Sequence, residues 1–338
     1  MKRVQVFGKR QARLVEVPDP TPKEDWVVVK IHVTPMCTEY KTFVAGHQAD
    51  QLGHEAVGEV VAVAQPGRVE VGDRVLVLPQ FPCGKCSLCL AGEYVYCEHS
   101  YDFARHHGTA DGSATMAQYI LKPDWLLYPI PEGLSYERAS LSACALGPSF
   151  GAFRETGLSA FDTVLVTGAG PVGLGAVVNA RFSGARAIVV ESIPYRVERA
   201  RQMGAEAVLD PGDADLVKKI RDLTEGRGVD CALDCAGAVA AQRVCIEATR
   251  RRGRIAFVGE CEDELPIRVS PDLIRNGFHV VGSWYYNISD TAAVLKVIQG
   301  SPLLDLLVSH VLPMSRIQEA FELSASHQTA KVLLKPWE

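Results

Sequence analysis

Four cysteines within one short stretch form the most specific chemical pattern in this sequence. They follow the spacing C-x2-C-x2-C-x7-C and are Cys83, Cys86, Cys89 and Cys97. Spacers this short let the backbone turn and aim four thiolates at one tetrahedral zinc ion. Disulfide bonds between such close neighbours would strain the loop. Because four sulfur ligands leave no open coordination position, we expect this zinc to brace a loop and to take no part in chemistry.

A glycine-rich run forms the second chemical pattern. It has the form G-x-G-x-x-G and reads Gly168-Ala169-Gly170-Pro171-Val172-Gly173. The run follows a predicted strand, Val164–Thr167, and opens a predicted helix at Pro171, where the missing N–H of proline is not needed. Gly168 permits a tight turn, Gly170 lets a pyrophosphate approach the backbone, and Gly173 lets helix and strand pack closely. With the helix N-terminus offering N–H groups to phosphates, the motif predicts a dinucleotide site.

An acidic residue follows at the distance that a dinucleotide site requires. Glu191 directly follows the predicted strand Ala187–Val190 and lies 23 residues after Gly168. A carboxylate there can accept hydrogen bonds from both ribose hydroxyls of NAD and would repel the additional phosphate of NADP. Arg196 lies near in the sequence and could serve a 2′-phosphate, or it could pair with a neighbouring glutamate. The charge argument favours NAD.

A second group of potential metal ligands is scattered along the chain. Its members are Cys37, His54, Glu55 and Cys144. A catalytic zinc takes three protein ligands, commonly cysteine or histidine, and keeps a fourth position for water or substrate. The sequence distances leave a second interpretation open for Cys144, which is also typical of a small core residue.

The segments around these residues predict two kinds of structure. The first part is β-rich, with expected strands at Trp26–Val33, Glu59–Val63 and Arg74–Leu78. From about residue 148, apolar strands alternate with helical segments, which predicts an α/β fold with a doubly wound parallel sheet covered on both faces. We also expect a helix over Ala240–Arg250, whose C-terminal arginines complement the helix dipole before a strand at Arg254–Val258.

The overall composition excludes several classes of protein. The chain has 338 residues, enough for about two domains, and a net charge of −5, which gives no reason to expect nucleic acid or an anionic membrane as partner. No apolar run approaches the ~20 residues of a membrane-spanning helix, and we expect no signal peptide. Four of the ten cysteines form a metal pattern, which favours a reducing cytoplasm.

Taken together, these motifs resemble those of the medium-chain zinc-dependent alcohol dehydrogenases. Within that family, the chain is most similar in type to the polyol, threonine and sorbitol dehydrogenases. The likeness is carried by GHEAVGEVVAV at 53–63, GDRV at 72–75, the four-cysteine loop and GAGPVG at 168–173. The resemblance implies a GroES-like catalytic domain over residues 1–147, completed by 284–338, and a Rossmann domain over 148–283. It also implies a catalytic zinc on Cys37, His54 and Cys144, with Glu55 approaching or supporting the metal.

One segment departs from the family pattern. The family reads C-x-[ST]-D at its first ligand, whereas this chain reads Cys37-Thr38-Glu39-Tyr40. An alignment without a gap places Glu39 at the hydroxyl position of the proton relay and Tyr40 at the aspartate position, and this alignment is slightly preferred because it keeps Gly46 in register. A one-residue deletion instead makes Thr38 the hydroxyl and Glu39 the carboxylate that orients His54.

The resemblance implies an oxidoreductase of class EC 1.1.1.- that moves a hydride between an alcohol and NAD, with a secondary alcohol, polyol or sugar-like substrate. Glu39 or Thr38 would take the proton, and Val172 would press the nicotinamide ring towards the substrate. We expect two zinc ions per chain, a small-molecule substrate and a homodimer or homotetramer. The alternatives are a zinc-independent NADPH quinone or enone reductase on the same fold, and a non-catalytic dinucleotide-binding protein.

Overall fold

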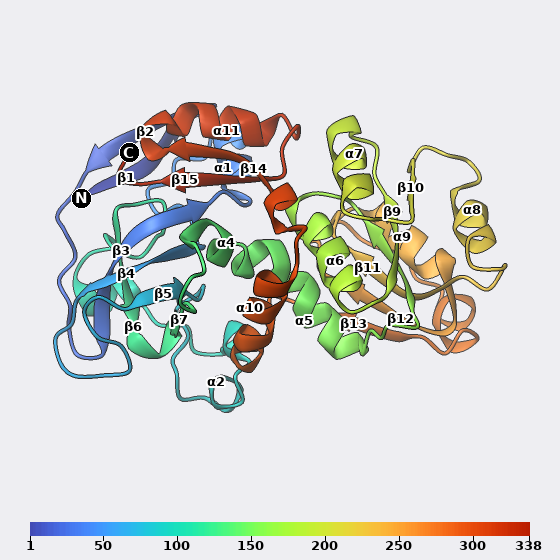
Figure 1. Ribbon diagram of the computed structural model, residues 1–338, viewed down its shortest axis with the longest axis horizontal. Helices are drawn as coiled ribbons and strands as arrows, with labels where there is room; N and C mark the ends of the chain where they lie inside the picture. The colour runs from blue at the N-terminus through green and yellow to red at the C-terminus, as the bar shows by residue number, and fades with distance from the viewer. The chain divides into compact units, whose positions relative to one another are not determined.

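The chain folds into two compact units (Figure 1). The computed structural model describes all 338 residues. The first unit comprises Met1–Ala143, Asn287–Thr291 and Val308–Glu338, and the second comprises Cys144–Tyr286 and Ala292–Leu307. The segment 284–338, expected to complete the catalytic domain, is therefore divided between the two units. None of the helices has the length and apolar character needed to span a bilayer.

The first unit is built on β-strands. A two-stranded sheet joins β1 (Lys2–Gly8) to β2 (Gln11–Glu16), and a larger sheet has the order β14-β15-β3-β4-β5-β7, with β6 also pairing with β3. The strands of the larger sheet are β3 (Trp26–Pro35), β4 (Ala56–Ala62), β5 (Arg74–Val77), β6 (Tyr119–Pro123), β7 (Leu127–Pro129), β14 (Val308–Pro313) and β15 (Lys331–Lys335). Alternate residues of β3, including Val27, Val29 and Ile31, enter one core cluster, as the two-residue period of a strand requires.

Short helices connect these strands. They are α1 (Glu39–Ala45), α2 (Ser87–Leu90), η1 (Tyr94–Tyr96), α3 (Phe103–His107), η2 (Asp124–Leu126), α4 (Tyr136–Ser140), η5 (Ile288–Asp290), η7 (Met314–Arg316) and α11 (Ile317–Ala325). The helix α11 packs on α1, where the rings of Phe43 and Phe321 stack 4.8 Å apart, so the C-terminal part of the chain shares a core with the segment that carries Cys37. After α4, a π-helical segment, η3 (Ser142–Leu146), contains Cys144 and has a kink at Ala143.

The second unit contains the predicted parallel sheet. Its six strands have the order β10-β9-β8-β11-β12-β13, and all neighbours run parallel. They are β8 (Thr163–Thr167), β9 (Arg186–Val190), β10 (Ala207–Leu209), β11 (Val229–Asp234), β12 (Thr249–Phe257) and β13 (His279–Gly282). The helical segments are α5 (Gly147–Thr156), α6 (Pro171–Phe182), α7 (Pro194–Gln202), α8 (Leu216–Asp222), α9 (Val239–Ala248), η4 (Val269–Ile274), α10 (Thr291–Gly300) and η6 (Leu304–Leu307).

The expected helix ending in arginines is wrong at its C-terminal end. Helix α9 ends at Ala248, and the arginines lie in β12. Arg250 pairs with Asp230 at 2.6 Å, and Arg254 pairs with Asp162 at 2.8 Å. The side chains therefore act as partners of carboxylates in the same unit, a use that the sequence pattern does not reveal.

Candidate functional site

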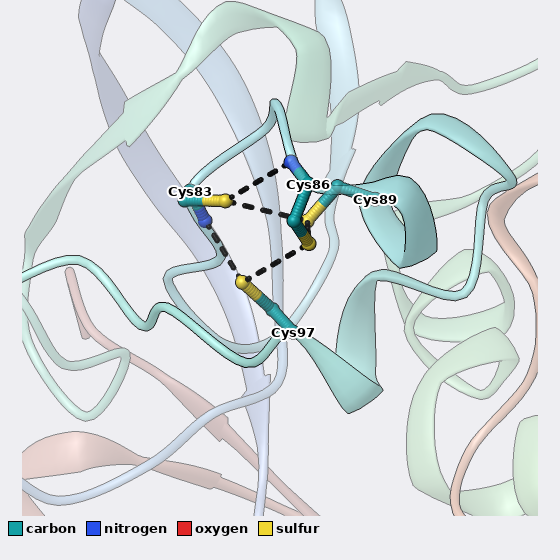
Figure 2. A group of neighbouring side chains, drawn as sticks. All are labelled: Cys83, Cys86, Cys89 and Cys97. Atoms are coloured by element: carbon teal, nitrogen blue, oxygen red, sulfur yellow. Dashed lines mark hydrogen bonds between the residues drawn. The ribbon is translucent and has the colours of Figure 1, made fainter.

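The four cysteines of the predicted structural site converge in space (Figure 2). The sulfur atom of Cys89 lies 4.0 Å from that of Cys83 and 3.5 Å from that of Cys86, and the Cys86 and Cys97 sulfurs are 3.9 Å apart. Four sulfurs at ~2.3 Å from one tetrahedral ion would be about 3.8 Å from each other. The separations therefore fit the edges of a tetrahedral four-sulfur zinc site.

Backbone amides point at these sulfurs. The amide of Cys86 donates to the sulfur of Cys83, and the amides of Cys83 and His99 donate to the sulfur of Cys97. Hydrogen bonds from backbone N–H groups lower the pKa of the Cys83 thiol to about 6, whereas burial and the neighbouring thiols raise that of Cys89 to about 12. The loop therefore favours thiolate on one side, and a divalent cation would supply the charge needed to hold all four thiolates together.

The scattered ligand group also converges. One ligand atom from each of Cys37, His54, Glu55 and Cys144 lies within 4.8 Å of the others. Cys37 lies between β3 and α1, the His54–Glu55 pair directly precedes β4, and Cys144 lies in η3. Two thiols, an imidazole and a carboxylate form a donor set that suits zinc. These residues fit a metal ion, as the four-cysteine loop does.

Glu39 connects two members of this group. Its Oε1 lies 2.8 Å from Nδ1 of His54, and its Oε2 accepts a hydrogen bond of 2.8 Å from the backbone amide of Cys37. A carboxylate on Nδ1 leaves Nε2 of the imidazole to face a metal, as in carboxylate–histidine–zinc arrangements. The contact between Glu39 and His54 is the one expected from the alignment with a one-residue deletion, in which Glu39 orients His54. The preferred gapless alignment instead places Glu39 at the hydroxyl position of the proton relay.

His54 holds its proton tightly in these surroundings. Burial opposes charge on the imidazole, but its interactions with Cys37 and Glu39 prevail and raise its pKa to about 11. A metal ligand must be a neutral imidazole, so an ion at this place competes with a proton.

A buried ion pair lies behind the ligands and was not foreseen from the sequence. Nζ of Lys331, in β15, lies 2.6 Å from Oε1 of Glu55, and both side chains are 0% exposed. Burial raises the pKa of Glu55 to about 7, against the opposing effect of Lys331. Nε2 of His54 is 4.0 Å from the same carboxylate oxygen. A lysine inside the buried run KVLLK is the one sequence signal that could have indicated this partner.

The glycine motif has the geometry expected of a dinucleotide loop. Gly168 has a φ of +81°, and a side chain there would overlap Ala236. A Cβ on Gly173 would lie 1.8 Å from the carbonyl oxygen of Gly168, so the helix packs directly on the turn. A Cβ on Gly170, by contrast, would have only the Arg196 guanidinium near it, at 3.8 Å or more. The space above Gly170 is therefore accessible to a phosphate.

Glu191 stands at the edge of this loop. Its Oε2 accepts a hydrogen bond of 2.8 Å from the amide of Ala169, and its Oε1 accepts from the amides of Ser192 and Ile193 at 2.8 and 2.9 Å. These three bonds fix the carboxylate directly after β9, where it faces the glycine loop. Pro171 and Val172 form the first turn of α6.

Similarity to known proteins agrees with this arrangement. Residues 23–132 match the alcohol dehydrogenase GroES-like domain, and residues 171–300 match the zinc-binding dehydrogenase domain. L-threonine 3-dehydrogenase of Pyrococcus abyssi is 32% identical over 98% of this chain and 97% of its own length. Sorbitol dehydrogenase of Bacillus subtilis is 30% identical over 99% of this chain and 97% of its own length.

Solved structures agree as well. An alcohol dehydrogenase from Thermus sp. ATN1 superposes with a TM-score of 0.90 at 27% identity, covering 99% of both chains. The 2R,3R-butanediol dehydrogenase from Bacillus subtilis gives 0.85 at 26% identity, again over 99% of both chains. The chain belongs to the zinc-binding alcohol dehydrogenase family, with a GroES-like and a Rossmann domain, and is an oxidoreductase.

Proposed function

We propose that this chain is a zinc-dependent, NAD-linked dehydrogenase of a secondary alcohol, polyol or sugar-like substrate. One observation carries the proposal: four ligand atoms lie within 4.8 Å of one another, and the imidazole among them is oriented by Glu39. The names of its relatives, which include threonine, sorbitol and butanediol dehydrogenases, support a substrate with a hydroxyl-bearing carbon.

We assign the catalytic zinc to Cys37, His54 and Cys144. The carboxylate of Glu55 is already neutralised by Lys331, so we assign this pair to the support of the ligands and not to binding of the ion. When bound by these residues, zinc would supply Lewis-acid polarisation of the substrate oxygen, and NAD would serve as the hydride acceptor.

We assign to Thr38 the transfer of the proton from the substrate hydroxyl. Both oxygens of Glu39 are engaged, one by His54 and the other by the amide of Cys37, so Glu39 serves to position the histidine. The Thr38 side chain is exposed and does not cap helix α1, although it occupies the N-cap position. Its hydroxyl can therefore pass the proton of the substrate hydroxyl to solvent.

We propose NAD as the cofactor and two zinc ions per chain. The carboxylate of Glu191, held by three amides beside the glycine loop, can accept hydrogen bonds from ribose hydroxyls and would repel a 2′-phosphate. Arg196 lies beside Gly170 and is placed to contact a phosphate of the dinucleotide. Metal analysis distinguishes this proposal from a zinc-independent reductase on the same fold, for which no zinc is expected.

The test of the function pairs an activity screen with one variant and one control. Alcohols, polyols and sugars are offered with NAD or NADP, and the absorbance of the reduced cofactor is followed. His54→Ala should abolish turnover while preserving NAD binding, and His47→Ala, a change at an exposed histidine, should leave both unaltered. Undiminished activity in His54→Ala would refute the zinc assignment, and NAD binding without turnover of any substrate would favour a non-catalytic binding protein.

We further propose a cytoplasmic homodimer. Strand β13 ends the parallel sheet, and its outer edge has unpaired backbone groups that a second copy could satisfy. Val280 of β13 is an exposed apolar side chain, as are Val269 and Ile274 of the preceding segment η4. Val280→Asp should convert the dimer to a 36.7 kDa particle in sedimentation, whereas Val71→Asp, at another exposed valine, should not. A wild-type monomer would refute this assignment.

A further inference from the structure

A turn within the four-cysteine loop contacts a distant segment of the chain. This turn, Ala91–Glu93, joins α2, which carries Cys89, to η1, which precedes Cys97. The amide of Ile288 donates to the carbonyl of Gly92 at 3.1 Å. The turn is thus held by the two short helices that flank it and by a segment almost 200 residues later.

Asn287 makes the most specific of these contacts. Its Nδ2 donates to the carbonyl of Ala91 at 3.1 Å and to Oε1 of Glu93 at 2.8 Å. Its Oδ1 accepts from the amide and hydroxyl of Ser289 at 2.9 and 2.8 Å, which caps the short helix η5. The Asn287 side chain therefore donates hydrogen bonds to the four-cysteine loop through its amide nitrogen and accepts hydrogen bonds from its own segment through its amide oxygen.

Gly92 is shaped for this contact. It has a φ of +87°, which favours glycine, and a Cβ at this position would lie 2.3 Å from Oδ1 of Asn287 and 3.0 Å from Ile288. A side chain would separate the two segments, so the glycine allows their close approach.

Asn287 begins a short segment, Asn287–Thr291, in which the chain passes from the second unit to the first and back; we call it the crossover. Residues Asn287–Thr291 belong to the first unit, while the residues on either side belong to the second. Immediately upstream, the backbone of Tyr285 and Tyr286 packs on Gly151 of α5, where a Cβ would lie 2.2 Å from the Tyr285 carbonyl oxygen. The crossover therefore changes from one set of contacts to the other within two residues.

We propose that the four-cysteine loop and the crossover Asn287–Thr291 form one zinc-dependent structure, with Asn287 as its positioning residue. The inference rests on the proposed zinc in the four-cysteine loop. Zinc fixes Cys89 and Cys97 and thereby fixes the turn that accepts from Asn287 and Ile288. By reciprocity of coupled equilibria, the contacts that order the crossover when zinc is bound strengthen zinc binding by the same factor.

Hydrogen–deuterium exchange during titration with a metal chelator tests this coupling without any substrate. In the zinc-loaded wild type, peptides covering residues 83–97 and 286–291 should lose protection over the same range of chelator concentration. Asn287→Asp keeps the oxygen that caps η5 but loses both donors to the loop. It should lower the chelator concentration needed by on the order of tenfold, because one of the lost bonds goes to a charged group.

Matched variants separate this role from a general loss of stability. Asn276→Asp removes two comparable side-chain donors in the second unit and should leave the titration unchanged. Glu93→Gln added to Asn287→Asp offers a donor to the new carboxylate and should restore part of the wild-type behaviour. Glu93→Ala, which removes the same bond from the other side, should weaken protection as Asn287→Asp does.

Two results would overturn the inference. One is protection of residues 286–291 that persists after residues 83–97 have lost theirs, and the other is an Asn287→Asp titration identical to that of the wild type. Metal analysis of the wild type is read separately, because a zinc-loaded loop without coupling refutes only this inference. A loop that binds no zinc would refute the metal assignment as well.

Discussion

Lys122 offers a sharp test of the energetics of the first unit. It lies in β6, is 2% exposed, donates to the carbonyl of Gln80 and stands 4.0 Å from the ring centre of Phe81. Burial lowers the pKa of this amine from its ordinary 10.5 to about 7. The unfolded chain therefore holds a proton that the folded chain lacks at pH values between these two limits.

The sign and size of the effect follow from this difference. Since the unfolded state binds the additional proton, the free energy of unfolding rises with pH from about 7 to 10.5, by up to ~1.36 kcal/mol per pH unit. Lys122→Met removes this dependence. We therefore expect the stability of the variant relative to the wild type to decline by about 2 kcal/mol between pH 7 and pH 9.

Equilibrium urea unfolding of the zinc-loaded protein at pH 7, 8 and 9 measures this difference. Comparison at each pH cancels the titration of all other groups, and the absolute difference also includes the Gln80 carbonyl left without its donor. Lys296→Met, at an exposed position of α10, serves as the control and should give a difference that does not vary with pH. A constant difference for Lys122→Met would refute the reasoning, because it would mean that the amine is charged in the folded protein throughout this range.

Three further predictions concern the site. Lys331→Met should destabilise the protein by about 3–5 kcal/mol in urea unfolding, because it removes the buried ammonium partner of the Glu55 carboxylate, and adding Glu55→Gln should recover part of the loss. Glu39→Gln should lower zinc affinity about 10–100-fold in chelator competition, and an unchanged affinity would contradict its role as the histidine's positioning residue. Gly173→Ala should weaken NAD binding in calorimetry while zinc content stays normal, since its Cβ would overlap the turn of the glycine loop. Unaltered NAD affinity would count against the dinucleotide assignment.

Local sequence patterns predicted the features of the fold and site that depend on residues close together in the chain. The spacing of Cys83 to Cys97 and the run from Gly168 to Gly173 predicted a metal loop and a strand–turn–helix, and both geometries are present. The alternation of strands and helices likewise predicted the parallel sheet, which the structure confirms.

The features that the sequence did not reveal depend on long-range packing. Lys331 reaches Glu55 across 276 residues, and Asn287 reaches Ala91 of the cysteine loop across 196, so no spacing rule could pair them. The alignment around Glu39 was ambiguous because a one-residue shift changes which side chain faces His54. Only the geometry shows the carboxylate on Nδ1.

We assign a catalytic zinc ion to Cys37, His54 and Cys144, apart from the ion in the four-cysteine loop. Anomalous diffraction at the zinc absorption edge, from crystals grown with zinc, tests it most directly. We expect two peaks per chain, one among the four cysteines and one bonded to these three residues, with Glu55 still paired with Lys331. A single peak, confined to the four-cysteine loop, would contradict it.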